Sequence, residues 1–328
     1  MVAPEIPAPG SDRDSAALAV IGRRLHRQEA SVGDDVERLL ELIQQRFGES
    51  LAAVLVYGSY LRGKRDTVLD FYALLDDYRA MPWWQALLCR LLAPNVYFLS
   101  TGTGLDAARA KCASLSLDRF EQAMRGDFHS YFWARFAQPC QLLYVRDESS
   151  RVRVHAALLA AANTFLRRVV PMLPSRLSTR DLWQRGFELT YRAELRAEKG
   201  GYSKGLIDAD PDYYRDLTRL LAGPRLQPLP DDSPTAVELT QSWHNRSSDT
   251  ERWQAQCSWW LRRLQGKWLS LARIAKAATM FDDPLDYILW KIERHSGIHV
   301  EPSKRQRRHP LIFAWPLLWN LYRHGAFK

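Results

Sequence analysis

A glycine-serine pair and an aspartate lie in two neighbouring apolar runs of VLVYGSYLRGKRDTVLDFYALLDD, residues 54–77. Gly58-Ser59 ends the first run and Asp70 interrupts the second. A carboxylate buried in a strand is costly unless it is paired or binds a metal ion. Backbone N–H groups of a tight turn can bind phosphate, and a carboxylate can bind a hard divalent cation. The pattern predicts a site for a nucleoside triphosphate with Mg²⁺. An ordinary hairpin turn with an aspartate at a strand end is the alternative.

The apolar periodicity predicts the elements that would hold these residues. Residues 51–59 and 67–77 are predicted strands, and the basic segment GKRD connects them. A helix is expected before them at 34–47, where apolar residues recur at helical spacing behind an acidic start. Later patterns predict a helix at 82–94, a strand at 95–101, a strand and helix at 110–124, and a last strand at 140–147. Together they predict a compact α/β unit.

The 328-residue length and the shifts in composition predict several parts. An N-terminal tail rich in Pro, Ser and Gly is followed by the α/β domain, a mostly helical domain for which a winged-helix-like arrangement is one option, a Pro-rich linker, and a C-terminal helical region. The predicted boundaries are 1–15, 16–148, 149–225, 226–250 and 251–328.

The Gly-Ser pair and the following aspartate resemble the nucleotidyltransferase superfamily. In that superfamily an Asp-apolar-Asp pair lies on the strand after the Gly-Ser turn. Here the second carboxylate would fall at Tyr72, so a two-metal clamp cannot be built from this strand alone. Either the metal site is completed elsewhere or the protein is catalytically inactive.

Several further motifs, in order along the chain, resemble the mitochondrial-type CDP-diacylglycerol synthase family, also called the translocator assembly and maintenance family. They are LDFYALLDDYRAMPWWQALLCRLLAPNVYF, AKCASLSLDRFEQAM, SYFWARFAQPC and ELTYRAELRAEKGGYSKGLIDADPDYYRDLTRLL. The resemblance runs from about Val54 to Leu221, roughly half the chain. It implies a nucleotidyltransferase fold and the formation of CDP-diacylglycerol from CTP and phosphatidic acid.

The resemblance also implies roles for individual residues. Asp70 matches the metal-binding aspartate, and Asp76 or Asp77 matches an acidic pair, with Asp77 expected as the second metal ligand. Lys111 would act with Asp70 in catalysis as a point charge on the triphosphate. The other assignments are Tyr57, Gly58, Ser59, Lys111 and Arg135 for the nucleotide, and Tyr191, Arg196 and Lys204 for the substrate phosphate, with Glu194 matching the same motif. The structural alternatives are a solvated strand edge for Lys111, a helix-surface ion pair for Arg135 and a solvated helix face for Arg196.

The charge of the chain favours anionic partners. The formal net charge is +9 and the isoelectric point is near 9.5. Near the C-terminus a basic cluster, Lys304, Arg305, Arg307 and Arg308, precedes Trp315 and Trp319. This pattern predicts contact with an anionic membrane surface. A helix docked on the protein core is the alternative, and no RNA-binding motif accompanies the cluster. The earlier segment WWLRRLQGKWLSLARIAKAATMF predicts a packed helix with a basic exposed face.

No apolar segment is long enough to span a membrane, and the four scattered cysteines are expected to be reduced core thiols. We therefore expect a cytoplasmic protein that is peripheral on the inner face of the membrane. The family resemblance implies that it is a Mg²⁺-dependent phosphatidate cytidylyltransferase. The alternatives are a nucleotidyltransferase with another acceptor, such as a small molecule, RNA or protein, and an inactive nucleotidyltransferase fold serving as a membrane-associated scaffold.

Overall fold

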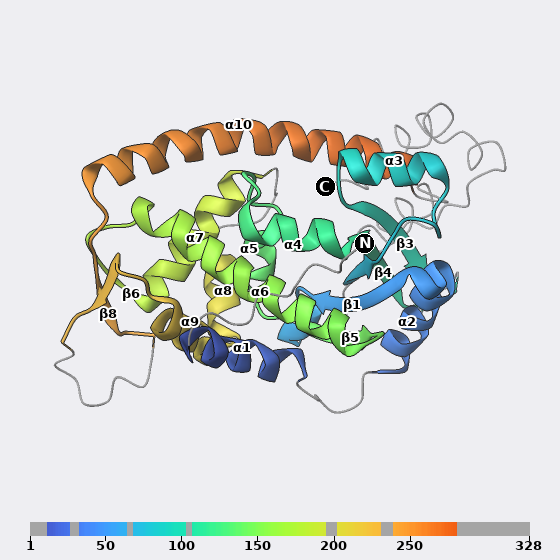
Figure 1. The fold of residues 1–328 in the computed structure, drawn as a ribbon, viewed down its shortest axis with the longest axis horizontal. Helices are drawn as coiled ribbons and strands as arrows, with labels where there is room; N and C mark the ends of the chain where they lie inside the picture. The colour runs from blue at the N-terminus through green and yellow to red at the C-terminus, as the bar shows by residue number, and fades with distance from the viewer. Residues whose placement is uncertain are drawn as a thin grey trace, which may run out of the picture.

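The computed structural model describes residues 12–26, 33–63, 68–102, 107–194, 202–230 and 239–280. Its sheet has five strands in the order β3-β4-β2-β1-β5, and only the β2/β4 pair is parallel (Figure 1). The strands are β1 (Leu51–Tyr57), β2 (Leu69–Leu75), β3 (Asn95–Ser100), β4 (Arg109–Ser116) and β5 (Gln141–Val145). All five lie where the apolar runs predict strands.

Each face of the sheet is covered by helices. On one face, residues of α2 (Asp34–Phe47) and α3 (Trp83–Leu91) join an apolar cluster with strand residues such as Val54, Phe71 and Cys112. Helix α2 buries Val36, Leu39, Ile43 and Phe47, the spacing from which the helix is predicted. The opposite face packs on α4 (Leu117–Gly126), α5 (Trp133–Phe136) and α6 (Glu148–Val169).

The helical part continues the core of that second face. Helix α1 (Asp12–Leu25) packs on α6 and on α9 (Pro211–Leu221), while α7 (Thr179–Arg192) contacts α6, α9 and α8 (Tyr202–Asp208). The predicted tail at 1–15 is too long, because α1 begins at Asp12. Short 3-10 turns are η1 (Gly48–Ser50), η2 (Tyr60–Arg62) and η3 (Val170–Met172).

A second, three-stranded sheet is formed by β6 (Arg176–Ser178), β8 (Ser242–Asn245) and β7 (Leu226–Pro228), in the order β6-β8-β7. The prediction of a linker over 226–250 is therefore wrong for the part that forms β7 and β8. Trp243 explains why this segment is ordered: its indole is buried and donates to the Thr179 hydroxyl at 2.8 Å.

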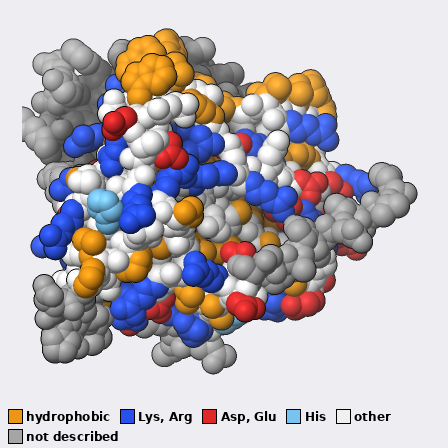
Figure 2. Space-filling model, turned by 60° about the vertical axis from the view of Figure 1, so that its left-hand side comes forward, with side chains coloured by type: hydrophobic (Ala, Val, Ile, Leu, Met, Phe, Trp, Pro, Cys, Tyr) orange, Lys and Arg blue, Asp and Glu red, His pale blue; other side chains and the backbone are white. Residues whose placement is uncertain are grey.

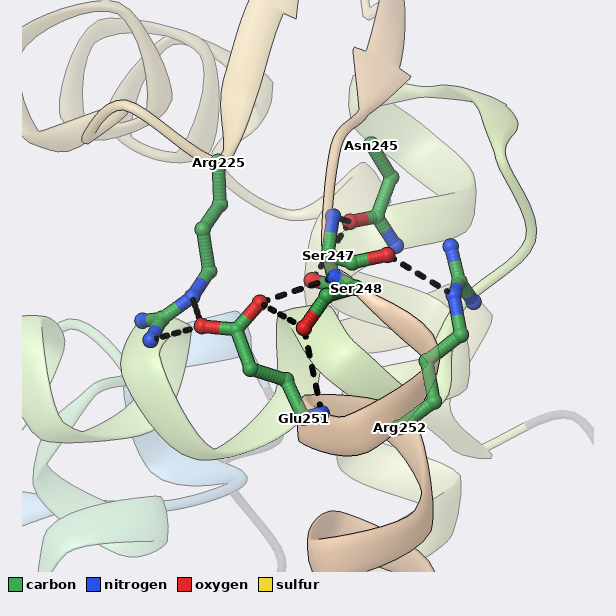
Figure 3. Close-up of polar contacts among 6 residues, drawn as sticks. All are labelled: Arg225, Asn245, Ser247, Ser248, Glu251 and Arg252. Carbon is green, nitrogen blue, oxygen red and sulfur yellow. Dashed lines mark hydrogen bonds and ion pairs between the residues drawn. The ribbon is translucent and has the colours of Figure 1, made fainter.

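The long helix α10 (Asp249–Met280) begins at a polar cluster beside this small sheet (Figure 3). Ser248 and Glu251 form a reciprocal N-terminal cap: the Ser248 amide donates to Glu251 Oε2 at 2.9 Å, and the Glu251 amide donates to Ser248 Oγ at 3.3 Å. Arg225, at the start of β7, donates to the other carboxylate oxygen at 2.8 Å. Arg252 donates to the Ser247 carbonyl at 3.2 Å. The cap and the ion pair fix where α10 starts and in which direction it leaves the sheet.

From this cluster α10 runs along the helical part to the end of α3 (Figure 1). Its inner face includes Trp259, whose indole donates to the Arg168 carbonyl at 3.0 Å, and the fully buried Arg262. Near the end of the helix, Arg273 donates to the Ala93 carbonyl at 3.0 Å and Lys276 donates to the Pro94 carbonyl at 2.7 Å. The prediction of a basic exposed face is therefore wrong for Arg262, Arg273 and Lys276, because their cationic groups bind backbone carbonyls of the body of the protein.

Two further sequence expectations can be compared with the structure. Cys89, Cys112 and Cys140 are buried thiols, but Cys257 is exposed on α10 and is not a core residue. Within the part of the chain that the structure describes, no helix has the length and apolarity needed to cross a bilayer. The basic and aromatic C-terminal segment lies outside the described residues.

Candidate functional site

The strand registers bring three of the predicted site residues together. Asp70 of β2 is paired with Tyr57 of β1 on one side and with Lys111 of β4 on the other. Directly paired residues point to the same face of a sheet, with Cβ atoms about 5 Å apart. Tyr57, Asp70 and Lys111 are all half-buried. Asp70 and Lys111 are therefore neighbours across the β2/β4 pair, on one face of the sheet, where β1 ends and β2 and β4 begin.

Gly58 closes one side of this cluster. Its φ of 97° lies in the left-handed region that favours glycine. A Cβ atom at this position would lie 3.1 Å from Asp70 Oδ2, so the carboxylate is held against the glycine backbone. Ser59 follows with φ −70° and begins the single turn of η2. The Gly-Ser turn and the aspartate thus meet in space as the sequence pattern predicts.

Arg62 and a small cavity lie on the other side of the turn. Arg62 donates to the Gly58 carbonyl at 3.0 Å. The cavity has a volume of about 60 Å³ and is bordered by Gly58, Arg62, Asp210 and Tyr214. Asp210 is held by a two-bond ion pair with Arg24, with distances of 2.7 and 2.8 Å. The Tyr214 hydroxyl is buried and has no hydrogen-bond partner in the structure. The cavity therefore has both polar and charged walls.

Tyr72 lies where the resemblance to nucleotidyltransferases would place a second carboxylate. It is buried, two residues beyond Asp70 on the same face of β2. Its hydroxyl accepts a hydrogen bond of 2.8 Å from the half-buried Arg135. The Arg135 guanidinium also lies 5.5 Å from the centre of the Tyr57 ring and 4.2 Å from that of Tyr131. Arg135 thus borders the cluster, and one of its N–H groups donates to Tyr72; its predicted role in nucleotide binding stays a prediction.

A cluster of charged and aromatic side chains, which includes Tyr131 and Arg273, extends from Arg135 towards α10. The Tyr131 ring lies between Arg135 and Arg273, whose guanidinium carbon is 4.0 Å from the ring centre. Burial alone would raise the pKa of Tyr131, but the two nearby positive charges more than offset it and the pKa is lowered. Burial, reinforced by the charge of Arg273 and partly opposed by that of Asp127, lowers the pKa of His129 to about 4. Glu194 also influences His129, Arg135 and Arg273 electrostatically.

Asp77 is not part of this cluster, so its prediction as a second metal ligand is wrong. Asp70 lies near the start of β2 and Asp77 lies beyond its end, which separates them by roughly 20 Å along an extended chain. Asp77 instead accepts from the Ser50 hydroxyl and the Arg79 amide, both at 2.9 Å. The Arg79 amide is the main cause of its lowered pKa. Asp76 forms an ion pair with Arg146 and also lies at this far end.

The residues predicted to bind the substrate phosphate have different positions. Tyr191 lies in the last turn of α7, where its ring stacks on Phe187. Lys204 is exposed on α8 and does not line the cavity beside Gly58. Arg196 and the predicted membrane contacts lie outside the described residues; those contacts are Arg305, Arg307, Arg308, Trp315 and Trp319.

The donor set can be compared with the needs of Mg²⁺. Among the described residues, no group of three or more His, Cys, Asp or Glu side chains could hold a metal ion. However, Mg²⁺ at nucleotide sites is usually bound by one or two carboxylates together with phosphate oxygens and water. Asp70 beside the Gly58 turn satisfies this smaller requirement.

Sequence reasoning missed Arg62, Tyr131 and Arg273. Arg62 carried a usable signal, because it lies four residues after Gly58 in the same predicted turn. Arg273 is far away in the sequence and reaches Tyr131 only through the path of α10. In comparisons with known proteins, no family model and no curated protein matches the chain.

Proposed function

We propose that the protein is a nucleotidyltransferase that transfers the cytidylyl group of CTP to phosphatidic acid at a membrane surface, releasing pyrophosphate. The observation that carries the proposal is the contact between the Asp70 carboxylate and the Gly58 backbone, with Lys111 paired beside Asp70. This combination supports triphosphate binding, because it places a turn, an anionic metal ligand and a cation within one side-chain layer. The sequence resemblance supports CTP, phosphatidic acid and a nucleotidyltransferase fold. A winged-helix-like arrangement of the helical part stays a prediction.

The reaction forms a bond between a phosphate oxygen of phosphatidic acid and the α-phosphorus of CTP. The bond from that phosphorus to the bridging oxygen breaks, and its electron pair leaves with pyrophosphate. The attacking phosphate is already an anion near neutral pH, so no side chain has to remove a proton. Catalysis would then depend on alignment and charge stabilisation.

Each side chain has a part in this scheme. Asp70 would hold Mg²⁺ together with triphosphate oxygens, and the bound ion would neutralise charge on those oxygens. Lys111 would add a positive charge next to Asp70. Arg135 would keep Tyr57 and Tyr72 in place through its hydrogen bond and ring contacts, while its remaining donors contribute to phosphate binding. Arg62 would hold the Gly58 carbonyl and with it the shape of the turn.

Tyr72 is the observation that favours a second candidate, an inactive nucleotidyltransferase fold. A tyrosine engaged by Arg135 stands where the superfamily has a second carboxylate. Nucleotide binding without turnover is the expected behaviour of such a protein.

A transfer assay separates these functions. Purified protein is incubated with Mg²⁺, phosphatidic acid in detergent micelles and each α-³²P-labelled nucleotide in turn. We expect a labelled lipid only with CTP, and a loss of at least about a hundredfold in Asp70→Asn. The matched control Asp77→Asn should remain active. Transfer from ATP without use of CTP would overturn the lipid assignment, and full activity of Asp70→Asn would exclude this site.

A further inference from the structure

Helix α10 has its apolar side chains on the outside. Trp253, Trp260 and Trp268 are 65%, 60% and 74% exposed, and Leu261, Leu264 and Leu271 are also exposed. The separations along the series 253, 257, 260, 264, 268 and 271 are three or four residues, so these positions follow one face of the helix. Figure 2 shows hydrophobic side chains along the upper edge of the molecule, where α10 runs in Figure 1.

The inner face of the same helix carries one buried tryptophan, one glycine and three cations. Trp259, Arg262, Gly266, Arg273 and Lys276 recur at spacings of three, four or seven residues and point the opposite way. Burial lowers the pKa of Arg262 to about 10, and its guanidinium lies 4.6 Å from the ring centres of Phe128 and Trp259. Because the inner face is fixed by these contacts, the tryptophan face cannot turn inward.

Helix α3 also has an exposed apolar face. Trp83 is 79% exposed, and Leu87 and Leu91 follow it at helical spacing and are also exposed. The chain just after α3 is bonded to the last turns of α10, through Arg273 to the Ala93 carbonyl and Lys276 to the Pro94 carbonyl. Large exposed apolar patches on proteins mark interaction sites.

We propose that this outer surface of α10 and α3 docks on an anionic phospholipid bilayer. Tryptophan is the side chain most suited to the boundary between headgroups and acyl chains. Arg263 and Lys267 border the apolar face of α10, and Arg90 is exposed on α3. From Arg252 to Met280, and throughout α3, the sequence has no Asp or Glu, so beyond the first turn of α10 no carboxylate on these helices repels negatively charged headgroups.

The docking helix is linked to the candidate site. Arg273 lies on the inner face of α10 and contacts the Tyr131 ring, which in turn contacts Arg135. A bilayer bound to the outer face of α10 would therefore be separated from Arg273 and Tyr131 only by the helix itself. The docking proposal itself does not depend on nucleotide chemistry.

The test uses Cys257, which is exposed on the apolar face, while Cys89, Cys112 and Cys140 are buried. The full chain is labelled at Cys257 with a polarity-sensitive fluorophore and mixed with vesicles of phosphatidylcholine alone or with 30% phosphatidic acid or phosphatidylserine, without nucleotide. We expect blue-shifted emission with both kinds of anionic vesicle and a much smaller shift with neutral vesicles. Added salt should weaken the binding.

Unlabelled variants are compared by vesicle flotation. Trp268→Glu should lower the fraction bound about tenfold or more, because it puts a charge into the apolar layer. Val152→Glu is the matched control: it also replaces an exposed apolar residue, on α6, and should bind like the wild type. Equal binding by Trp268→Glu and wild type would overturn the proposal.

Two other results would also overturn it. A blue shift that depends on protein concentration without vesicles would assign the face to a second copy of the chain. A Cys257 thiol that reacts only after unfolding would show that the face is covered within the chain. Because transfer to phosphatidic acid in micelles is measured separately, loss of docking with transfer retained would defeat this inference alone.

Discussion

The two ends of β2 carry the same kind of side chain in different settings. At one end, Asp70 is pressed against Gly58 and paired with Lys111 and Tyr57, next to a charged cavity. At the other end, near the surface, Asp76 forms an ion pair with Arg146. Asp77 forms an ion pair with Arg79 and accepts a hydrogen bond from Ser50. The difference shows that the surrounding backbone and charges decide whether an acidic residue of a motif can bind a ligand or only stabilises a turn. The far-end carboxylates hold turns together, whereas Asp70 faces a site built from three strands.

The largest effect should come from removing the charge of Asp70, with the same change at Asp77 as the control. CTP with Mg²⁺ at about a hundred times its dissociation constant should stabilise the wild type by about 2.7 kcal/mol. Asp70→Asn should lose this stabilisation, because it keeps the shape of the side chain and removes its charge. Asp77→Asn should keep it. Thermal unfolding with and without the ligand measures both, and equal shifts in the two variants would contradict the comparison.

Glycine substitutions test the contact between the turn and Asp70. Gly58→Ala should cost about 1–3 kcal/mol of stability through the positive φ and lower activity about a hundredfold by displacing the carboxylate. Gly63→Ala is the control, since Gly63 also has a positive φ of 82° but no atom within 4 Å of an added Cβ. It should lose stability without losing activity. Stability is read from urea unfolding and activity from the transfer assay.

Acid should destabilise the protein through the buried His129, which lies near Asp127 and Arg273. The folded pKa of His129 is about 4 and the unfolded value is 6.5, so the unfolded chain takes up the proton first as the pH falls. Stability should therefore be lost between pH 6.5 and pH 4, by up to about 3 kcal/mol. His129→Gln should remove this part of the pH dependence in urea unfolding, whereas His244→Gln, at an exposed position of β8, should leave it. An unchanged slope in His129→Gln would rule out this cause.

The smallest expected effect concerns Tyr72. Tyr72→Phe removes the hydrogen bond between Arg135 and the Tyr72 hydroxyl and should cost about 1–2 kcal/mol of stability, together with weaker stabilisation by CTP. Tyr97→Phe is matched, because Tyr97 is equally buried and donates to Gln85 Oε1 at 2.9 Å, on the opposite face of the sheet. Its CTP response should be normal. If both variants bind CTP as the wild type does, Tyr72 and Arg135 are structural residues.

Local elements could be predicted from the sequence because their signals are local. The helix at Asp34–Phe47 and the strands around Gly58 and Asp70 follow from apolar spacing, and the meeting of the turn with Asp70 follows from antiparallel pairing. The exclusion of Asp77 could also have been predicted, since seven residues of strand are too long for one metal site. The orientation of α10 could not, because periodicity identifies a two-faced helix without saying which face turns inward. An amphipathic helix usually turns its apolar face inward. In α10 the cationic face turns inward instead, because Arg262, Arg273 and Lys276 bind backbone carbonyls and the two arginines also contact aromatic rings.

Gly266 decides what α10 presents to its surroundings. A Cβ atom there would lie 2.0 Å from the Ala193 carbonyl oxygen, so the helix is seated backbone to backbone on the end of α7. With only a hydrogen atom at this point, rolling the helix about its own axis would push neighbouring side chains into that carbonyl. The absence of a side chain at Gly266 thus fixes the rotation of α10 about its own axis. This rotation places Trp253, Trp260 and Trp268 on the opposite, solvent-facing side of the helix.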